Sequence, residues 1–120
     1  MQNYFQLDEP EKWRCCIASE IDNQRPLVIE LTRTEPEDHC WLIFPRLFYC
    51  ETAGSDCWEN ADFSVAHPEE RLRYLRQFDV LKAVNDNILL SDYHLYHVNS
   101  SEGPVRIVSI GRGEIKNRLH

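Results

Sequence analysis

The stretch Cys40-Trp41-Leu42-Ile43-Phe44 is apolar at every position and carries no charge. An apolar run of this length predicts a strand that is covered on both faces, and we expect it to be the most buried strand of the fold. Pro45 follows directly and removes a donor from the hydrogen-bond ladder, so the strand ends there. Residues 47–50 then resume the β-prone pattern after a bulge or bend.

Two β-prone runs precede this strand and predict a hairpin. Residues 13–19 and 27–32 flank the polar segment 21–26, whose Asp, Asn and Pro residues are typical of turns. In the second run, the odd-numbered positions are all Leu or Ile, whereas the even-numbered positions include Glu and Thr, which is the alternation of a half-buried strand. The acidic segment 34–38 interrupts this pattern before the apolar run begins.

Helical signals appear only after a predicted loop at residues 51–63. Pro68 suits the first position of a helix, and Glu69 and Glu70 lie where the positive end of the helix dipole favours carboxylates. Apolar positions spaced along one broad face continue this helix through about Val84. The polar run 85–87 is expected to end it.

The pattern returns to strands in the last third of the chain. Residues 88–90, 93–98 and 105–110 are β-prone, and the turn residues of 99–104 connect them into a second hairpin. Strands on both sides of one main helix predict an α+β fold, with residues 1–120 in a single small domain. We expect a mostly antiparallel sheet of about five strands, built from a hairpin, a central strand and a second hairpin, with the helix on one face.

The formal charge is distributed unevenly along the chain. Residues 1–60 carry 12 Asp and Glu against 5 Lys and Arg, a net charge of −7, whereas residues 61–120 carry 8 of each. An acidic half of this kind favours a basic partner. The first residues lack the pattern of a secretory signal, and no apolar run approaches the roughly 20 residues that a membrane helix needs. We therefore expect a soluble cytoplasmic protein that does not bind membranes.

The five cysteines, at positions 15, 16, 40, 50 and 57, are expected to be reduced thiols that mainly fill the core. Their odd number and the adjacent pair at 15 and 16 do not suit a secreted disulfide framework. A redox or metal-sensing role for that pair is the alternative to packing. No Cys-x-x-Cys pair is present, and His94 and His97 fall on opposite faces of a predicted strand, so we expect no metal and no cofactor.

Asp92, His94 and Tyr96 form the nearest approach to a catalytic set, because alternate residues share one face of a strand. Asp92 could raise the basicity of His94, and Tyr96 could donate to an oxyanion. Polar residues that alternate along an exposed strand produce the same pattern, and we favour this structural interpretation. The chain is therefore expected not to be an enzyme, and no catalytic residue is assigned.

Basic residues near the end of the chain predict an alternative site for an anion. The candidates for binding nucleic acid or a phosphorylated ligand are Arg106, Arg112, Lys116 and Arg118. Arg71, Arg73 and Arg76 on the predicted helix have a structural explanation, namely ion pairs with carboxylates such as Glu69, Glu70 and Asp79. The overall negative charge and the absence of a nucleic-acid-binding motif make this a second hypothesis.

The first hypothesis is a non-enzymatic module that binds a basic protein, of the inhibitor, immunity or phage-antagonist type. It assigns the contact to acidic residues of the first half and to one aromatic anchor: Glu35, Glu37, Asp38, Asp56, Trp58 and Glu59. The competing interpretation is that Trp58 packs on the core and that the carboxylates only keep the protein soluble. Pairing of sheet edges between two copies leaves a homodimer open as well.

Overall fold

The computed structural model describes residues 3–117. The apolar stretch 40–44 forms the second half of β3 (Glu37–Phe44), which pairs antiparallel with β2 (Leu27–Thr34). Both strands belong to a first sheet, whose inner positions are buried. Its five antiparallel strands follow the spatial order β5 (Cys57–Glu59), β1 (Arg14–Ile17), β2, β3 and β9 (Glu114–Lys116).

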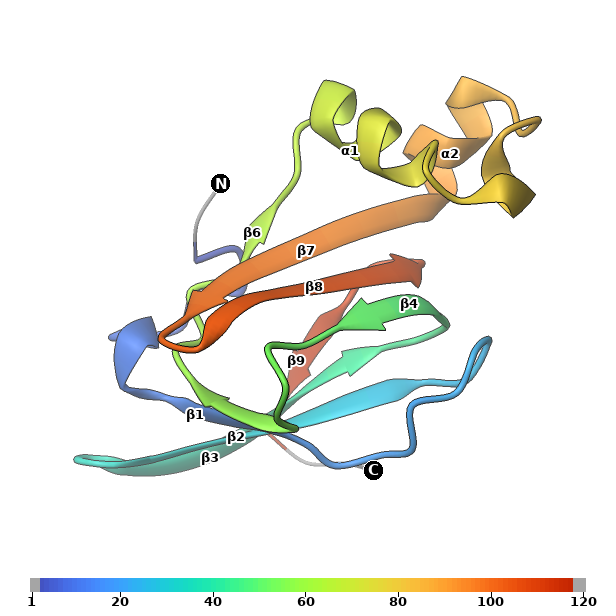
Figure 1. The fold of residues 1–120 in the computed structure, drawn as a ribbon. Coiled ribbons are helices and arrows are strands. Elements are labelled where there is room, and N and C mark those ends of the chain that lie inside the picture. Colours follow the sequence, from blue (N-terminus) through green and yellow to red (C-terminus); the bar gives the residue numbers. More distant parts are fainter. Residues whose placement is uncertain (1–2, 118–120) are drawn as a thin grey trace.

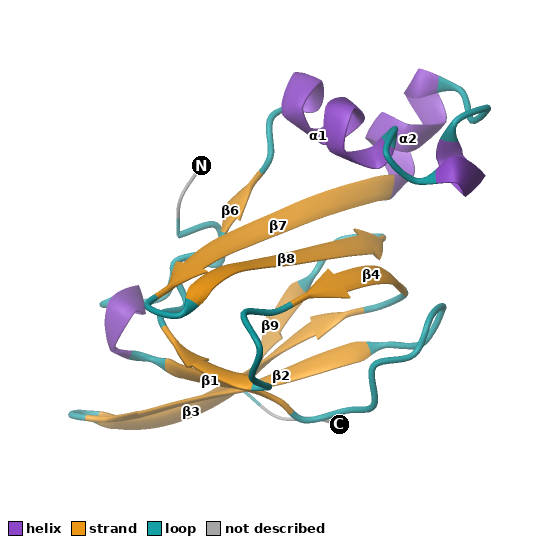
Figure 2. Cartoon of the chain, viewed as in Figure 1, coloured by secondary structure: helices purple, strands orange, loops and turns teal. Residues whose placement is uncertain are grey.

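A second antiparallel sheet begins where the chain turns at Pro45 and Arg46. Its central hairpin is the one predicted near the end of the chain, and the turn between its strands lies at residues 101–102. The four strands follow the order β4 (Leu47–Glu51), β8 (Gly103–Ile110), β7 (Tyr93–Ser100) and β6 (Ser64–Val65). Figure 2 shows the two sheets facing each other.

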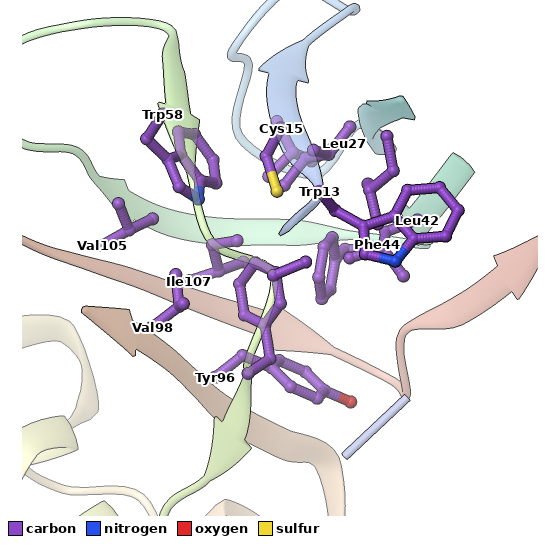
Figure 3. Close-up of a cluster of buried hydrophobic side chains, with 14 of the residues drawn as sticks. Trp13, Cys15, Leu27, Leu42, Phe44, Trp58, Tyr96, Val98, Val105 and Ile107 are labelled. Carbon is purple, nitrogen blue, oxygen red and sulfur yellow. The ribbon is translucent and has the colours of Figure 1, made fainter. Parts of the chain in front are cut away.

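Apolar side chains from both sheets fill the space between them. In the cluster drawn in Figure 3, Leu42 and Phe44 of β3 lie with Tyr96 and Val98 of β7, and all four side chains are buried. Burying a side chain of this size contributes about 1.5–3 kcal/mol. This cluster therefore stabilises the contact between the sheets and fixes which face of each sheet points inward.

The helices cover the other face of the second sheet, as Figure 1 shows. Leu75 and Leu89 are buried there with Leu95 of β7 and Val108 of β8. The fold thus has three layers: the first sheet, the second sheet and the helices. The helical layer consists of α1 (Pro68–Leu75), α2 (Asp86–Asp92) and the short 3-10 turn η2 (Asp79–Leu81). A further 3-10 turn, η1 (Pro10–Lys12), precedes β1 and lies apart from this layer (Figure 1).

The predicted α+β class and the antiparallel pairing are confirmed, but the prediction of one sheet of about five strands is wrong. Nine strands within residues 3–117 form two sheets. Three of these strands, β5, β6 and β9, are only two or three residues long, which is too short to show an alternating pattern. The bend at Pro45 also places β3 and β4 in different sheets.

The single main helix predicted to continue through Val84 is replaced by two short helices. α1 ends at Leu75 because Phe78 adopts an extended conformation, with its ring centroid 5.2 Å from that of Phe48 in β4. Asn85 begins α2 instead of ending a helix, since its side chain accepts a hydrogen bond from Asn87 N. No helix in the described part of the chain has the length and apolar character needed to cross a membrane.

The outer face of the first sheet has no layer of residues 3–117 packed over it (Figure 1). Cys40, Leu42 and Phe44 of β3 point inward and are buried, whereas Trp41 and Ile43 point outward and are only half-buried. The prediction that the stretch 40–44 is covered on both faces is therefore wrong. Apolar side chains of this strand occur on an open face as well as in the core.

Candidate functional site

The β2–β3 hairpin carries three of the acidic residues predicted to contact a partner. Thr34 pairs with Glu37, so the turn consists of Glu35 and Pro36, joined by a cis peptide bond. Glu35, Glu37 and Asp38 are all exposed, and we call them the acidic tip. In Figure 1 the hairpin extends beyond the other strands at its end of the molecule. The acidic tip is thus presented away from the body of the fold.

The cations nearest to the base of this hairpin are already engaged. Lys12 Nζ lies 2.7 Å from Glu9 Oε2. Arg33 lies over the ring of Trp13, with its guanidinium carbon 4.8 Å from the ring centroid, and it donates to the carbonyl oxygen of Asp8. Within residues 3–117 no residue of the acidic tip forms an ion pair. The carboxylates of the tip are therefore left without an ion pair in this part of the chain, although Lys12 and Arg33 line the same surface hollow as Glu35.

The other three predicted contact residues lie in or beside β5, in the segment expected to be a loop. Trp58 is buried, and its indole Nε1 donates to the carbonyl oxygen of Asn60 at 3.1 Å. Trp58 is therefore not available as the predicted aromatic anchor, and the competing interpretation that it packs on the core is confirmed. Glu59 is exposed and pairs with Arg14 at 3.1 Å, while Asp56 is exposed just before the strand.

The basic residues of the alternative site are not brought together. Arg106 lies in β8 and faces the helices, where its Nη1 is 3.0 Å from Glu51 Oε2. Lys116 lies in β9 of the first sheet, with its Nζ 3.9 Å from Glu114 Oε2. Arg112 follows β8, and Arg118 lies outside the described residues. Arg106 and Lys116 therefore belong to different sheets and do not form one anion site.

The helix arginines form none of the ion pairs expected from the sequence. Arg76 pairs with Asp86 of α2, and Arg73 has no ion pair within residues 3–117. Arg71 is buried, and its Nη1 donates to the carbonyl oxygen of Tyr93 at 3.3 Å. β6 pairs with β7 only at Tyr96 and His97, so it provides no backbone donor for the carbonyl group of Tyr93. Arg71 donates to this carbonyl group instead.

The predicted set of Asp92, His94 and Tyr96 is only partly assembled. Asp92 ends α2 instead of lying in the strand, and its carboxylate accepts a hydrogen bond from Ser91. Tyr96 is buried in the core, where its hydroxyl accepts a hydrogen bond from Gly113 N at 2.9 Å. Burial raises the pKa of Tyr96 to about 12, so the phenol stays protonated at neutral pH. The tyrosine thus has a structural role.

We expect the protein to lose stability on acidification because of two histidines in β7. Burial lowers the pKa of both His94 and His97, and nearby arginines lower it further. The unfolded chain therefore binds protons before the folded protein does. We expect the free energy of unfolding to be fully maintained above the unfolded-state pKa of 6.5 and to fall as the pH drops through it.

Urea unfolding at a series of pH values between about 8 and 5 measures this loss. The double variant His94→Gln, His97→Gln is expected to show a flatter decline than the wild type. An equal decline in the two proteins would show that other groups cause it.

The structure corrects the expectation that all cysteines are reduced. Cys16 of β1 and Cys57 of β5 are direct partners across the two strands and form a disulfide. Burial raises the pKa of the Cys40 and Cys50 thiols to about 11, which keeps them protonated and unreactive. No cluster of His, Cys, Asp or Glu that could hold a metal ion is found among residues 3–117. Since disulfides are rare in cytosolic proteins, the cytoplasmic location stays a prediction.

A pocket of about 410 Å³, which is not predicted from the sequence, lies between α1 and the second sheet. On the helix side, Glu70, Arg73 and Tyr74 line it. On the sheet side, His97 of β7 and Arg106 of β8 are direct partners across the two strands, so both side chains project toward α1. The pocket thus combines two arginines, a histidine, a tyrosine and a glutamate.

One sequence signal for this pocket was available. Glu70, Arg73, Tyr74 and Gln77 follow the i, i+3, i+4, i+7 spacing of a single helix face, and all four line the pocket. A helix face of mixed charge is usually exposed to solvent. Its juxtaposition with His97 and Arg106 depends on the pairing of β7 and β8, which the sequence does not specify residue by residue.

Comparisons with known proteins give no match for this chain. No protein-family model matches it, and no curated protein and no solved structure is significantly similar to it. What the protein binds is therefore inferred from its own surface.

Proposed function

We propose that the protein is a non-enzymatic binding module that engages a basic protein partner through the acidic tip of the β2–β3 hairpin. The observation that supports this most directly is the group of exposed carboxylates at Glu35, Glu37 and Asp38, none of which is ion-paired within residues 3–117. An inhibitor, immunity protein or phage antagonist directed against a basic protein is the class of function that we favour.

The hairpin suits this role because its two strands are paired as far as the turn. β2 and β3 are paired continuously from Leu27 opposite Phe44 to Thr34 opposite Glu37. A tip supported in this way loses little conformational entropy when a partner binds. The net charge of −7 adds a long-range attraction that accelerates the encounter with a basic protein.

Neutralising the acidic tip should slow association with the partner. We expect the triple variant Glu35→Gln, Glu37→Gln, Asp38→Asn to associate about tenfold more slowly at low salt, with a smaller change in the dissociation rate. The partner is first identified by affinity capture from nuclease-treated lysate, as a protein retained by the wild type and lost by the tip variant. Stopped-flow association of the purified pair over a salt series then gives the rates.

A matched control changes the net charge by the same amount elsewhere. Asp22, Glu69 and Glu102 are exposed and have no ion pair within residues 3–117, and their conversion to amides leaves the tip intact. The control should bind at nearly the wild-type rate. Equal slowing in both triple variants would show that only net charge matters, and rates independent of salt would contradict the electrostatic proposal.

Binding of nucleic acid or a phosphorylated ligand near the chain end stays the alternative. Deleting the residues after Ile110 does not test it cleanly, because β9 pairs with β3 and Gly113 N donates to Tyr96. Substituting Arg112, Lys116 and Arg118 with glutamine tests it without removing a strand. Loss of nucleic acid from the captured material in this variant alone would support the alternative.

A further inference from the structure

The pocket between α1 and the second sheet contains charges that are satisfied within the protein and charges that are not. Arg106 is satisfied, because Glu51 pairs with it at 3.0 Å and also accepts a hydrogen bond from the Tyr74 hydroxyl at 3.4 Å. Glu70 and Arg73 are exposed at the rim of the pocket and have no ion pair within residues 3–117. One carboxylate and one guanidinium therefore remain available to a ligand.

Glu70 and Arg73 line one pocket but do not form an ion pair with each other. Glu70 and Arg73 are three residues apart on α1, a spacing at which opposite charges commonly pair on a helix. Here they stay apart while lining the same pocket. A ligand with a negative and a positive end could engage both. A simple anion could pair with the guanidinium of Arg73, but it would be repelled by the nearby carboxylate of Glu70.

The sheet side of the pocket combines two apolar residues, Ala66 and Leu95, with the polar residues Ser64, His97 and Arg106. Leu95 and Ala66 are buried, and His97 and Ser64 beside them are half-buried. Burial lowers the pKa of His97, so the imidazole is neutral at pH 7 and adds no second positive charge. A volume of about 410 Å³ lies in the range of small-molecule sites.

We propose that this pocket binds a small zwitterion of the α-amino acid class. The ligand carboxylate pairs with the guanidinium of Arg73, its ammonium group pairs with the carboxylate of Glu70, and its side chain packs on Leu95 and Ala66. Arg106, held by Glu51, closes one side of the pocket. This site lies on the helix-covered face of the second sheet, whereas the acidic tip belongs to the first sheet, so the two binding functions can be tested separately.

The test is a titration of the full ¹⁵N-labelled chain, followed by heteronuclear NMR, with each standard L-α-amino acid at millimolar concentration. At least one of them should shift the amide signals of Ala66, Leu95 and His97. Blocking its ammonium group by acetylation, or its carboxylate by amidation, should each weaken binding about tenfold or more. Inorganic phosphate and acetate should bind more weakly than the zwitterion.

Two variants connect the binding to the rim charges. Glu70→Gln and Arg73→Gln alter exposed side chains without ion pairs, and each should weaken binding about tenfold. Glu69→Gln is the matched control, since Glu69 is exposed on the same helix but does not line the pocket.

Three results would overturn the proposal. One is the absence of shifts at the pocket with every amino acid. Another is equal binding of the blocked derivatives or of phosphate. The third is equal weakening by the Glu69 and Glu70 variants.

Discussion

Replacing Cys16 and Cys57 together with serine is expected to lower the free energy of unfolding by about 3–4 kcal/mol. The disulfide joins residues that are 41 positions apart, and such a closed loop restricts the unfolded chain far more than the folded one. β5 contributes only three residues to the edge of the first sheet, yet it carries the buried Trp58. The cross-link therefore holds a short strand, and part of the core, in place.

Guanidinium unfolding with and without reductant measures this contribution. The wild type should lose stability on reduction and approach the double variant, which should not respond to reductant. Cys50→Ser is the matched control, because it removes a half-buried thiol that belongs to no disulfide. Thiol labelling of the unfolded, unreduced protein should modify three of its cysteines, namely 15, 40 and 50. Labelling of all five, or a midpoint unchanged by reductant, would contradict the disulfide.

This disulfide illustrates which parts of the fold could be predicted from the sequence. Long strands can be predicted, because the eight residues of a strand such as β2 form an alternating pattern with a turn on each side. β5 has three residues, so its pairing with β1 leaves no pattern, and the partnership of Cys16 and Cys57 depends on that pairing. The odd number of cysteines argued against a disulfide framework but could not exclude a single cross-link.

The helical region shows a second limit, which arises from the ambiguity of local signals. Asn and Asp residues stop helices and also cap their first turn, so the run 85–87 predicts the end of a helix although Asn85 caps the start of α2. The start of α1 at Pro68 was predictable, because the proline and the carboxylates after it favour only one end of a helix. Tertiary contacts of Phe78 then ended α1 earlier than its apolar pattern suggested.

The two candidate sites also differ in how far they can be predicted from the sequence. The acidic tip was predictable, since Glu35, Glu37 and Asp38 occur within four consecutive residues beside a turn-forming proline. The pocket was not, because it joins a helix face to Arg106 and to His97, whose partnership is fixed by the register of β7 and β8. The sequence leaves two interpretations of Trp58 open, an aromatic anchor or a core residue, because its burial follows from the pairing of β5 with β1.

Replacing Phe44 with alanine is expected to have the second large effect, a decrease of about 3–5 kcal/mol in the free energy of unfolding. Its ring is fully buried, with its centroid 5.0 Å from that of Tyr96 and 6.1 Å from that of Phe5. Gly113 lies against the same ring: a Cβ atom added there would be 2.7 Å from Phe44 Cδ1 and Cε1. Gly113→Ala alone should therefore lower the free energy of unfolding by about 1–3 kcal/mol, because the packed ring of Phe44 has little room to move.

A double-mutant cycle shows whether this close contact links the segment before β9 to the core. Once Phe44 is alanine, the added methyl group at residue 113 no longer meets the Phe44 ring, and Phe5 Cζ at 3.3 Å is the remaining close neighbour. The double variant should therefore lose less stability than the sum of the two single losses, by about 1–3 kcal/mol. Leu75→Ala is the control partner, since Leu75 is buried in the other apolar cluster and should combine additively with Gly113→Ala. Urea unfolding of each protein provides the free energies. If Gly113→Ala costs the same in both backgrounds, the contact with Phe44 is not what requires glycine at this position, and the contact with Phe5 Cζ, 3.3 Å from the added Cβ atom, becomes the better explanation.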